Sequence, residues 1–557
     1  MEFSLLQPSN LDVKYNTLTP QAVNDLSIDY ICNALTKDVF EKNSIKNLMT
    51  NITDDERVIR YRCDIFDDLL RYPQLRNNLQ QLLSQLSELK ELDKFQKDTD
   101  ASDLWLLINR LREIDGYVNC ITQMKESLET IDIRSEGLLQ LKKIVTDIHD
   151  NSGFPEIKKD IADIMEKAKQ IRSITIGVNL DNLLRPENAG IISVNSFIIN
   201  DSGLMKNFFG KIKQSEELNS NPDFSSMKSF HTQNPNITKV ALAQTKAVLD
   251  TEAPTGSDQL SSNLTKTMTA IVKKIVFDIK NRIQKYIGIS GFTLVSLVPE
   301  IIFYIRWAEL LEKIQSKGLS LCKAVILPTA DRELFTKGIY NFKLAVKITE
   351  GEQIDIVDNE FEFSDNGRIY IMTGPNRGGK TTFTQAVGIA CLLAQNGIYV
   401  PAKSFSLSPC DNIYTHFPAD ENETVDLGRL GEESQRIAGI FDVATNKSLL
   451  LFNESLATTN VAEGLYIAKD VVRAMRYVGT RTIFNTHMHE LARNLDVLNA
   501  EPNGTSKVES LVTGVENGSR SFKVSIAPPQ GVSYARDIAV KYGVTFDQIK
   551  EKLSSRF

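Results

Sequence analysis

The sequence predicts a multidomain protein in which a long helical region is followed by an α/β domain. Two observations support this fold class. In the first third of the chain, leucine and other apolar residues recur at three- and four-residue steps, which is typical of amphipathic helices. From about residue 340 onward, apolar runs of strand length alternate with helical stretches, which is typical of a parallel or mixed sheet. The 557 residues are enough for roughly three or four domains.

The helical region changes character in its second half. Its first helices are expected at 76–95, 104–131, 135–149 and 156–172. Residues 173–181 and 190–197 then alternate and are rich in β-branched side chains, which predicts short strands. Residues 200–262 are rich in Ser, Asn, Asp, Gly and Pro and are expected to be mostly loop. Two further long helices are expected at 265–288 and 292–318. Pro299 should lie at a break or in a first turn.

The α/β region contains several strand signals separated by helical stretches. Strands are expected at FKLAVKI (342–348), FEFS (361–364), RIYIMTG (368–374), SLLLFN (448–453) and TRTIFNTH (480–487). The run TTFTQAVGIACLLAQNG (381–397) is expected to be a helix. The sequence contains no convincing internal repeat.

The composition excludes several classes of protein. With 42% hydrophobic and 24% charged residues, the chain resembles soluble globular proteins. No apolar run approaches the roughly 18 residues of a membrane span, and the first residues lack the pattern of a secretory signal. The six cysteines form no CxxC pair, which argues against a zinc site or a disulfide framework and favours a reducing cytoplasm. Because the net charge is −7, any contact with nucleic acid needs a local basic face.

The segment GPNRGGKT matches the phosphate-binding pattern G-x-x-x-x-G-K-[ST], with an expected strand before it and an expected helix after it. Its glycines allow backbone N–H groups to turn toward phosphate oxygens, and the helix N-terminus adds partial positive charge. Lys380 is expected to reach the β- and γ-phosphates of ATP, and Thr381 to hold Mg²⁺. The plainer interpretation, a glycine-rich turn with a chance lysine, is disfavoured by the complete pattern and its context. The expected ATP-binding residues here are Gly374, Pro375, Asn376, Arg377, Gly378, Gly379, Lys380, Thr381 and Thr382.

The apolar run at 449–452 leads into two polar residues, Asn453 and Glu454. At the end of a buried strand, Glu454 could orient and deprotonate the attacking water. Asn453 stands where an Asp usually holds Mg²⁺, directly or through water, and it keeps an oxygen acceptor without the charge. We therefore expect weaker metal affinity and slower turnover. The alternative is a core strand with an incidental glutamate.

His487 ends the next apolar run and is a third catalytic candidate. A histidine there could contact the γ-phosphate or position water, and the alternative is a capping or core histidine. The cluster His487-Met488-His489-Glu490 could also suggest a metal pair. The lack of a cysteine or third histidine nearby disfavours that reading.

These motifs, in this order, resemble the ATPase domain of the MutS family. The matching segments are TGPNRGGKTT, YVPA (399–402), LLLFNESLATTNVAEG (449–464), FNTHMHEL (484–491) and GVSYARDIAVKYGV (531–544). Upstream, the segments at 58–70, 173–181, 299–328 and 337–345 resemble the core and lever region of MutS-related proteins. The resemblance covers most of residues 1–545.

The resemblance implies an ABC-type ATPase that works as a homodimer, in which a signature loop of one subunit closes over the nucleotide of the other. The family loop S-T-F-x-x-E falls on residues 428–433, where the retained match is Glu433. Gly428 and Arg429 open an expected helix, and a helix N-terminus with an arginine is suited to meet a γ-phosphate in trans. The alternative for Arg429 is a solvated surface charge. Counting back from the phosphate loop points to Ile356 as a residue beside the adenine.

The sequence departs from the family pattern at several places. Arg377 replaces a usual Met, Asn453 replaces the usual Asp, and SLATTN replaces GRGTS. The mismatch-reading and connector modules of the family are not matched, so mismatch recognition is not carried over. The expected domains are 1–172 (helical core and first lever helices), 173–262 (short strands and loop, a reduced clamp), 263–340 (returning lever and core helices), 341–545 (the P-loop ATPase domain) and 546–557 (a C-terminal tail).

The residues themselves offer limited support for DNA binding. One expected helix carries the basic residues Lys273, Lys274, Lys280, Arg282 and Lys285. A basic helix is more often a solvated face than a DNA contact, and phosphate contact would show as steep salt dependence. Three hypotheses remain open: an ATP-hydrolysing dimer that clamps or senses DNA, an ATP-gated clamp with slow or no hydrolysis, and an SMC-like or transporter-type ATPase. The short separation between Lys380 and Glu454 disfavours the SMC version.

Overall fold

The computed structural model describes most of the chain outside residues 196–295. The described residues are 3–83, 104–151, 153–169, 173–180, 182, 186–195, 296–375, 377–418, 428–456, 461–502, 504–516, 519–529, 540 and 542–554. The chain divides into two compact units. The first comprises Met1–Ser87, Cys120–His149 and Phe292–Phe557, and the second comprises Glu88–Asn119 and Asp150–Gly291. Within the described ranges, none of the helices combines the length and the apolar character that a membrane crossing requires.

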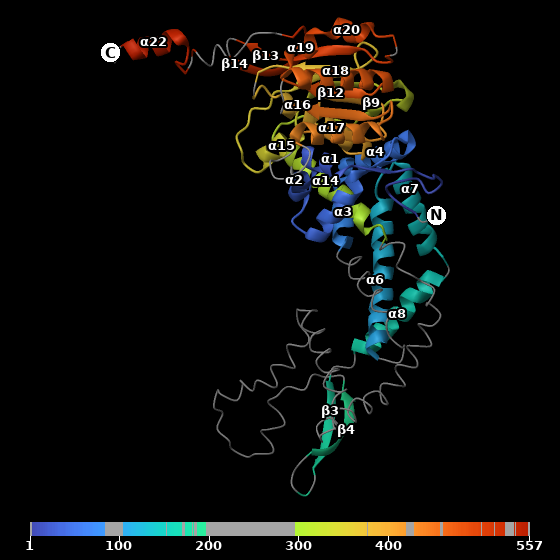
Figure 1. Cartoon of the computed structure of the whole chain (residues 1–557). Coiled ribbons are helices and arrows are strands. Elements are labelled where there is room, and N and C mark those ends of the chain that lie inside the picture. Colours follow the sequence, from blue (N-terminus) through green and yellow to red (C-terminus); the bar gives the residue numbers. More distant parts are fainter. Residues whose placement is uncertain are drawn as a thin grey trace. The chain divides into compact units, whose positions relative to one another are not determined.

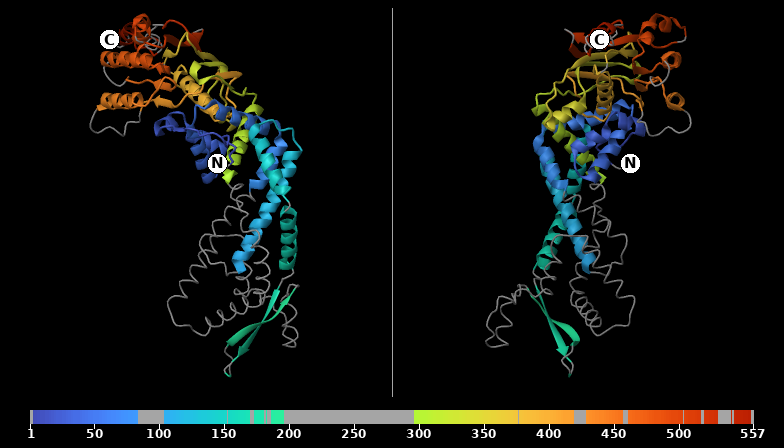
Figure 2. Two further views of the ribbon diagram at one scale, coloured as in Figure 1. Left: turned by 90° about the vertical axis from the view of Figure 1, so that its right-hand side faces the viewer. Right: turned by 60° about the vertical axis from the view of Figure 1, so that its left-hand side comes forward.

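The first unit begins with short helices that pack around one long helix from the middle of the chain. The N-terminal elements are β1 (Asn16–Thr17), α1 (Pro20–Asp25), α2 (Ile28–Leu35), α3 (Val39–Thr50), β2 (Asn51–Ile52) and α4 (Glu56–Arg71). Helix α14 (Val298–Ser316) packs against α2, α3 and α4, and Figure 2 shows this yellow-green helix beside the blue N-terminal ones. Pro299 lies in its first turn, as predicted. Arg306 on α14 donates two hydrogen bonds of 2.8 Å to the carboxylate of Glu41 on α3. This bidentate pair links the two helices in a defined geometry.

Helix α7 (Glu136–His149) joins this helical layer through α4. Asp68 on α4 accepts bonds from the backbone N–H groups of Arg134, at 2.9 Å, and Ser135, at 2.7 Å. These bonds satisfy donors just ahead of α7. The buried hydroxyl of Ser135, the residue just before α7, has no hydrogen-bond partner among the described residues.

The centre of the first unit is a six-stranded sheet with the order β10-β11-β12-β8-β13-β14. Its strands are β8 (Ile369–Thr373), β10 (Ile413–His416), β11 (Leu449–Asn453), β12 (Arg481–Asn485), β13 (Val508–Glu516) and β14 (Ser519–Ile526). All neighbouring pairs are parallel except β13 and β14. Strands β8, β11 and β12 are buried at every position, which explains why they appear in the sequence as continuous apolar runs rather than alternating ones.

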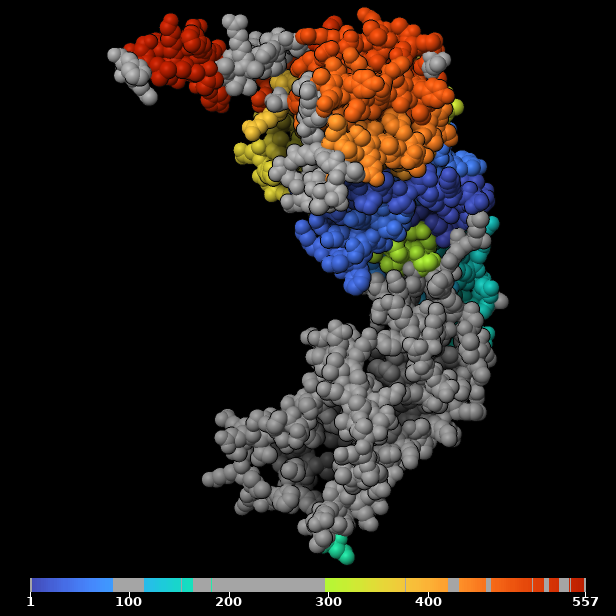
Figure 3. Space-filling model, in the orientation of Figure 1, coloured from blue at the N-terminus to red at the C-terminus, as the bar shows by residue number. Residues whose placement is uncertain are grey.

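Helices cover both faces of this sheet (Figure 1). One face carries α16 (Lys380–Gln395), where a Cβ on Gly388 would approach Leu451 of β11 to 2.6 Å and Leu26 of the N-terminal segment to 2.7 Å. On the other face, Leu450 and Phe452 join an apolar cluster with residues of the helices that follow. Those helices are α17 (Gly428–Phe441), α18 (Val461–Val478), α19 (His489–Arg493) and α20 (Leu495–Ala500). In Figure 3 the blue N-terminal segment lies directly against the orange part of the chain. Helix α1 contacts β10.

A second, four-stranded sheet has the order β5-β9-β6-β7. Its strands are β5 (Val325–Ile326), β6 (Leu334–Ile339), β7 (Asn359–Phe363) and β9 (Ser404–Leu407). The strand predicted at FKLAVKI is wrong, because this segment forms the helix α15 (Phe342–Thr349). The side chain of Asn341 caps the first turn through the N–H of Lys343, and the buried positions 342, 345 and 346 follow helical spacing.

The second unit contains α8 (Gly153–Lys169) and a hairpin of β3 (Ser173–Leu180) and β4 (Pro186–Asn195). The two strands pair antiparallel, with Ser173 opposite Asn195 and Val178 opposite Ala189. They correspond to the short strands predicted from the alternating pattern. Helix α6 (Leu104–Glu129) has residues in both units. Within the C-terminal residues predicted as a tail, the structure has the helix α22 (Phe546–Ser554).

Candidate functional site

The phosphate loop connects β8 to α16. Gly374 has φ +147° and Gly379, which caps α16, has φ +88°, so both positions favour glycine. Gly374 is also restricted by space, because a Cβ there would lie 2.0 Å from Thr513 Oγ1 on β13. Asn376 lies outside the described residues. The loop therefore presents backbone to the site at the point where α16 begins, the arrangement that binds anions.

Lys380 is the first residue of α16, and its side chain turns back into the loop. Only 4% of the residue is exposed, and Nζ donates to the carbonyls of Gly374 (3.2 Å) and Pro375 (3.0 Å). Burial lowers the pKa of this ammonium, and the nearby charge of Glu454 opposes that shift. A buried cation held by two neutral carbonyls can exchange these acceptors for phosphate oxygens, which would compensate its charge more fully.

Asn453 lies at the end of β11 and receives two hydrogen bonds on one oxygen. Thr381 Oγ1 donates to Asn453 Oδ1 at 2.8 Å, and Asn485 Nδ2, at the end of β12, donates to the same atom. The lone pairs of Thr381 Oγ1 are thereby left for another partner. The side-chain acceptor atoms of Thr381, Asn453 and the neighbouring Glu454 are all oxygen, the ligand atom that Mg²⁺ prefers.

Glu454 begins a tight turn after β11. It has φ +53°, and its N–H donates to the carbonyl of Asn485 at 2.8 Å. Its carboxylate Oε1 lies 2.8 Å from Nε2 of His487, so the ring N–H donates to it. The hydrogen bond from His487 is the main cause that lowers the pKa of Glu454, while partial burial acts against it and the charges of His487 and Lys380 add to it. The carboxylate is therefore ionised at neutral pH and able to accept a proton.

A cavity of about 420 Å³ extends from this cluster along α16. The predicted residues that line it are Ile356, Arg377, Gly378, Gly379, Lys380, Thr381, Thr382 and Glu454. Residues 354–357 and Leu344 of α15 also line it. Phe522 of β14 also lines it, with φ +54° and 43% of its surface exposed. Phe522 is not among the residues predicted from the sequence. In the sequence, its one distinguishing feature is that it is an aromatic residue in a polar segment. Its position beside Gly379 follows from the order of the strands in the sheet.

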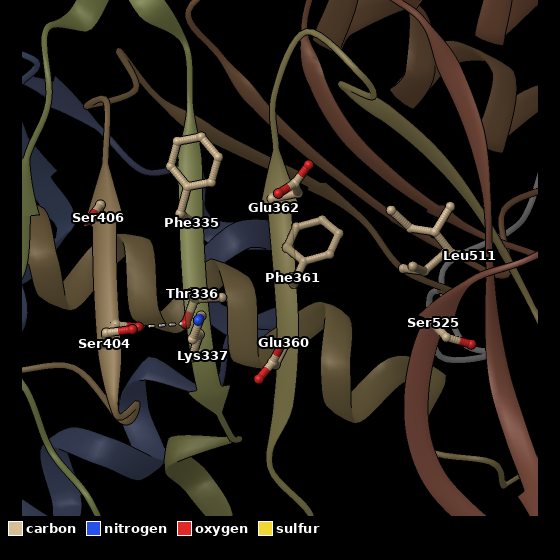
Figure 4. A pocket seen from close by; sticks show the side chains of 11 residues that line it. Phe335, Thr336, Lys337, Glu360, Phe361, Glu362, Ser404, Ser406, Leu511 and Ser525 are labelled. Atoms are coloured by element: carbon tan, nitrogen blue, oxygen red, sulfur yellow. Dashed lines mark hydrogen bonds between the residues drawn. The ribbon is translucent and has the colours of Figure 1, made fainter.

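A second cavity, of about 370 Å³, lies between the four-stranded sheet and β14 (Figure 4). Phe335 and Phe361 line it together with Leu511, and Thr336 Oγ1 donates to the carbonyl of Ser404 at 3.1 Å. This cavity holds none of the predicted phosphate-loop or strand-end residues. The chemistry of the candidate site therefore belongs to the first cavity.

The remaining predicted residues are distributed differently. Gly428 and Arg429 are the first residues of α17, and their side chains lie outside the described part of the structure. Glu433, further along α17, is buried and accepts a 2.5 Å bond from the backbone N–H of Leu456. The five basic residues predicted as DNA contacts, Lys273, Lys274, Lys280, Arg282 and Lys285, also lie outside the described residues.

Together, the loop between β8 and α16 and the polar ends of β11 and β12 define a P-loop nucleotide-binding protein. Comparisons with known proteins narrow this class. The family model described as MutS domain V matches residues 370–528, and the model described as MutS2 N-terminal domain matches residues 54–317. The chain belongs to the MutS family.

Curated relatives match over a part of the chain. The "DNA mismatch repair protein MutS 2" of Haloarcula marismortui is 34% identical over 184 residues, which are 33% of this chain and 19% of that protein. The "DNA mismatch repair protein MutS" of Chlorobium chlorochromatii is 36% identical over 143 residues, or 26% of this chain and 16% of that protein. The protein of the same name from Myxococcus xanthus is 34% identical over 197 residues, or 32% and 22%. The matched regions thus span about a fifth of each of these relatives.

Proposed function

We propose that this protein binds and hydrolyses ATP with Mg²⁺, and that it works as a homodimeric, ABC-type ATPase whose nucleotide state moves lever helices and a clamp on DNA. The observation that carries the ATPase proposal is the cluster at the ends of β11 and β12. Thr381 donates to Asn453, and His487 donates to Glu454, beside the buried Lys380. One cavity is lined by the glycine-rich loop, the ammonium of Lys380, the hydroxyl of Thr381 and the carboxylate of Glu454. These are the groups that phosphoryl transfer requires.

Each residue has a separate role in this proposal. MgATP supplies the phosphoryl group that is transferred to water. Lys380 balances phosphate charge, Thr381 offers a metal ligand, and Asn453 orients that hydroxyl. Glu454 accepts a proton from the attacking water, and His487 holds the carboxylate ionised and in place. Ile356 and Phe522 are the proposed apolar contacts of the adenine.

The dimer and DNA parts of the proposal rest on the family. The residues Gly428 and Arg429, at the N-terminus of α17, are the proposed contacts to a γ-phosphate bound by the partner subunit. The regions 1–172 and 263–340 are the proposed core and levers, 173–262 a reduced clamp, and 341–545 the ATPase domain. The curated relatives are named as DNA mismatch repair proteins, and we propose DNA as the partner here, with a role in repair or recombination.

A second candidate function is an ATP-gated clamp with very slow or no hydrolysis. It is favoured by Asn453, whose neutral amide supplies no charge to a metal ion and whose oxygen is already engaged by two donors. In this case ATP acts as a conformational ligand that shifts the equilibrium between open and closed forms.

Phosphate release by the full chain separates the two candidates. The assay uses MgATP with and without DNA, and it compares the wild type with Glu454→Gln, which keeps the shape of the side chain and removes the base. Hydrolysis predicts turnover in the wild type that falls by about 10²- to 10⁴-fold in the variant, with ATP binding retained. Equal rates for the two proteins, with ATP bound by both, would establish the clamp without hydrolysis.

DNA binding is tested by a salt titration with mismatched, branched, single-stranded and plain duplex DNA, each with and without ATP. Contact with phosphates predicts an affinity that falls steeply as salt rises. Failure to bind any of these substrates at low salt would remove DNA from the proposal.

A further inference from the structure

The turn that carries Glu454 has an unusual backbone. Glu454 has φ +53° and Leu456 has φ +61°, and neither residue is glycine. Residues other than glycine rarely adopt a positive φ, and this backbone conformation persists where the surroundings hold it in place. The position of the Glu454 carboxylate therefore depends on what holds residues 454–456.

Three contacts from three different elements hold the turn. The N–H of Glu454 donates to the carbonyl of Asn485 at the end of β12. Ser455 Oγ lies 2.7 Å from Nδ1 of His416, at the end of β10, and donates to its carbonyl at 3.0 Å. The N–H of Leu456 donates to Oε2 of Glu433 at 2.5 Å.

The third contact differs from the first two in origin. Asn485 and His416 end strands that flank β11 in the same sheet, so they are fixed to the turn by the sheet itself. Glu433 lies on α17, a helix on the face of the sheet. Glu433 is 9% exposed, and Leu456, whose N–H its carboxylate accepts, is 1% exposed. A charge-assisted bond in such surroundings is among the stronger hydrogen bonds in a protein.

We propose that Glu433 is a positioning residue for ATP hydrolysis: it ties α17 to the turn that carries Glu454, so that the placement of this helix sets the placement of the catalytic carboxylate. The inference rests on the proposed ATPase activity. Glu433 would act inside its own subunit, whereas Gly428 and Arg429 of the same helix are proposed to contact the nucleotide of the partner subunit. A shift of α17 would pull on Leu456 through this bond and so change the turn that carries Glu454.

Four variants of the full chain, one of them a control, test the role of the acceptor oxygen. Glu433→Met keeps the length of the side chain and loses the acceptor, and Glu433→Gln keeps an oxygen that can accept from Leu456. Gln435→Ala is the matched control, because Gln435 is an exposed polar residue on the same helix. Glu433→Ala serves as a second variant without the acceptor, should Glu433→Met fail to fold.

The readouts are kcat, the Kd of a fluorescent ATP analogue, and hydrogen exchange of a peptide that covers residues 452–456. Glu433→Met is expected to lower kcat by about tenfold or more, with the analogue Kd changed by less than about twofold, since the base is displaced while the nucleotide contacts remain. Exchange at the turn rises in the same variant. Glu433→Gln restores both kcat and protection, and Gln435→Ala leaves both at wild-type values.

The hydrogen exchange separates failure of this inference from failure of the ATPase proposal. If the wild type does not hydrolyse ATP, the ATPase proposal fails, and exchange at the turn still shows whether Glu433 holds it. If the wild type hydrolyses ATP and Glu433→Met keeps both kcat and protection, the positioning role is overturned. Equal losses in Glu433→Met and Glu433→Gln would also overturn it, because they would assign the effect to charge and not to the bond with Leu456.

Discussion

The hydroxyl of Thr381 donates a 2.8 Å hydrogen bond to the amide oxygen of Asn453, across the gap between the phosphate loop and β11. A carboxylate in place of Asn453 would accept the same bond and add a negative charge next to the metal ligand. The amide orients Thr381 equally well but leaves the cation to Thr381 and the phosphates. The proposed metal site therefore has its oxygen atoms held in place without the negative charge that a carboxylate at position 453 would add.

Replacement of Asn453 by Asp should restore that charge with little change in shape. We expect the Mg²⁺ concentration for half-maximal ATPase activity to fall by about tenfold, because a carboxylate holds a divalent cation more strongly than an amide does. The measurement is a Mg²⁺ titration of phosphate release at saturating ATP. Asn453→Ala is the control, and it should raise the Mg²⁺ requirement by removing the acceptor that orients Thr381. An unchanged Mg²⁺ requirement in Asn453→Asp would show that this position does not contribute to the metal site.

The pair of His487 and Glu454 predicts a specific pH dependence. The hydrogen bond from His487 lowers the pKa of Glu454 below its ordinary value of 4.5, so the carboxylate proposed as the base stays ionised to lower pH than a free glutamate. Without this hydrogen bond the pKa of Glu454 should rise toward its ordinary value. Removal of His487 should therefore move the acidic limb of the kcat/KM profile to higher pH.

The measurement compares the pH profiles of the wild type, His487→Ala and His487→Gln. The glutamine keeps an N–H donor and should leave the acidic limb near its wild-type position. A carbon-13 titration of the labelled Glu454 carboxyl gives the same pKa without turnover. An acidic limb that stays in place in His487→Ala would exclude His487 as the cause of the shift.

The parts of the site that were predictable share one property: each is encoded by neighbours in sequence. The loop at 374–381 and the polar residues after 449–452 are local patterns, so their chemistry could be inferred before the fold was known. The segment FKLAVKI was predicted as a strand because a short apolar run fits a strand and a buried helix equally well. The side chain of Asn341 caps the segment and favours the helix. Phe522 and the bond between Glu433 and Leu456 depend on which strands and helices are neighbours in space, which no local pattern encodes.

Gly374 is expected to tolerate no side chain. A Cβ at this position would lie 2.0 Å from Thr513 Oγ1, and the backbone has φ +147°. Gly374→Ala should therefore displace the loop and weaken ATP binding by about tenfold or more, with a loss of roughly 1–3 kcal/mol in the free energy of unfolding. Isothermal titration with an ATP analogue and chemical denaturation measure the two effects. Gly439→Ala is the matched control, because a Cβ there meets no atom within 4 Å and the helix α17 accepts alanine readily. ATP affinity at the wild-type level in Gly374→Ala would show that the loop adjusts without cost.

Phe522 is expected to contribute to nucleotide affinity through its ring. It lines the same cavity as Ile356 and Lys380, and it remains 43% exposed although it is a large apolar residue with φ +54°. An exposed aromatic ring in a strained backbone position gains stabilisation when a planar base stacks on it, and such stacking contributes about 1–3 kcal/mol per base. Phe522→Ala should accordingly raise the Kd for ATP by about tenfold, while kcat at saturating ATP stays close to the wild-type value, because in its proposed role the ring contacts the base and takes no part in activating water. Phe522→Tyr keeps the ring and should bind as the wild type does. A comparison of ATP with inorganic triphosphate completes the measurement: if Phe522→Ala weakens both ligands equally, the ring supports the phosphate loop beside Gly379 and does not contact the base.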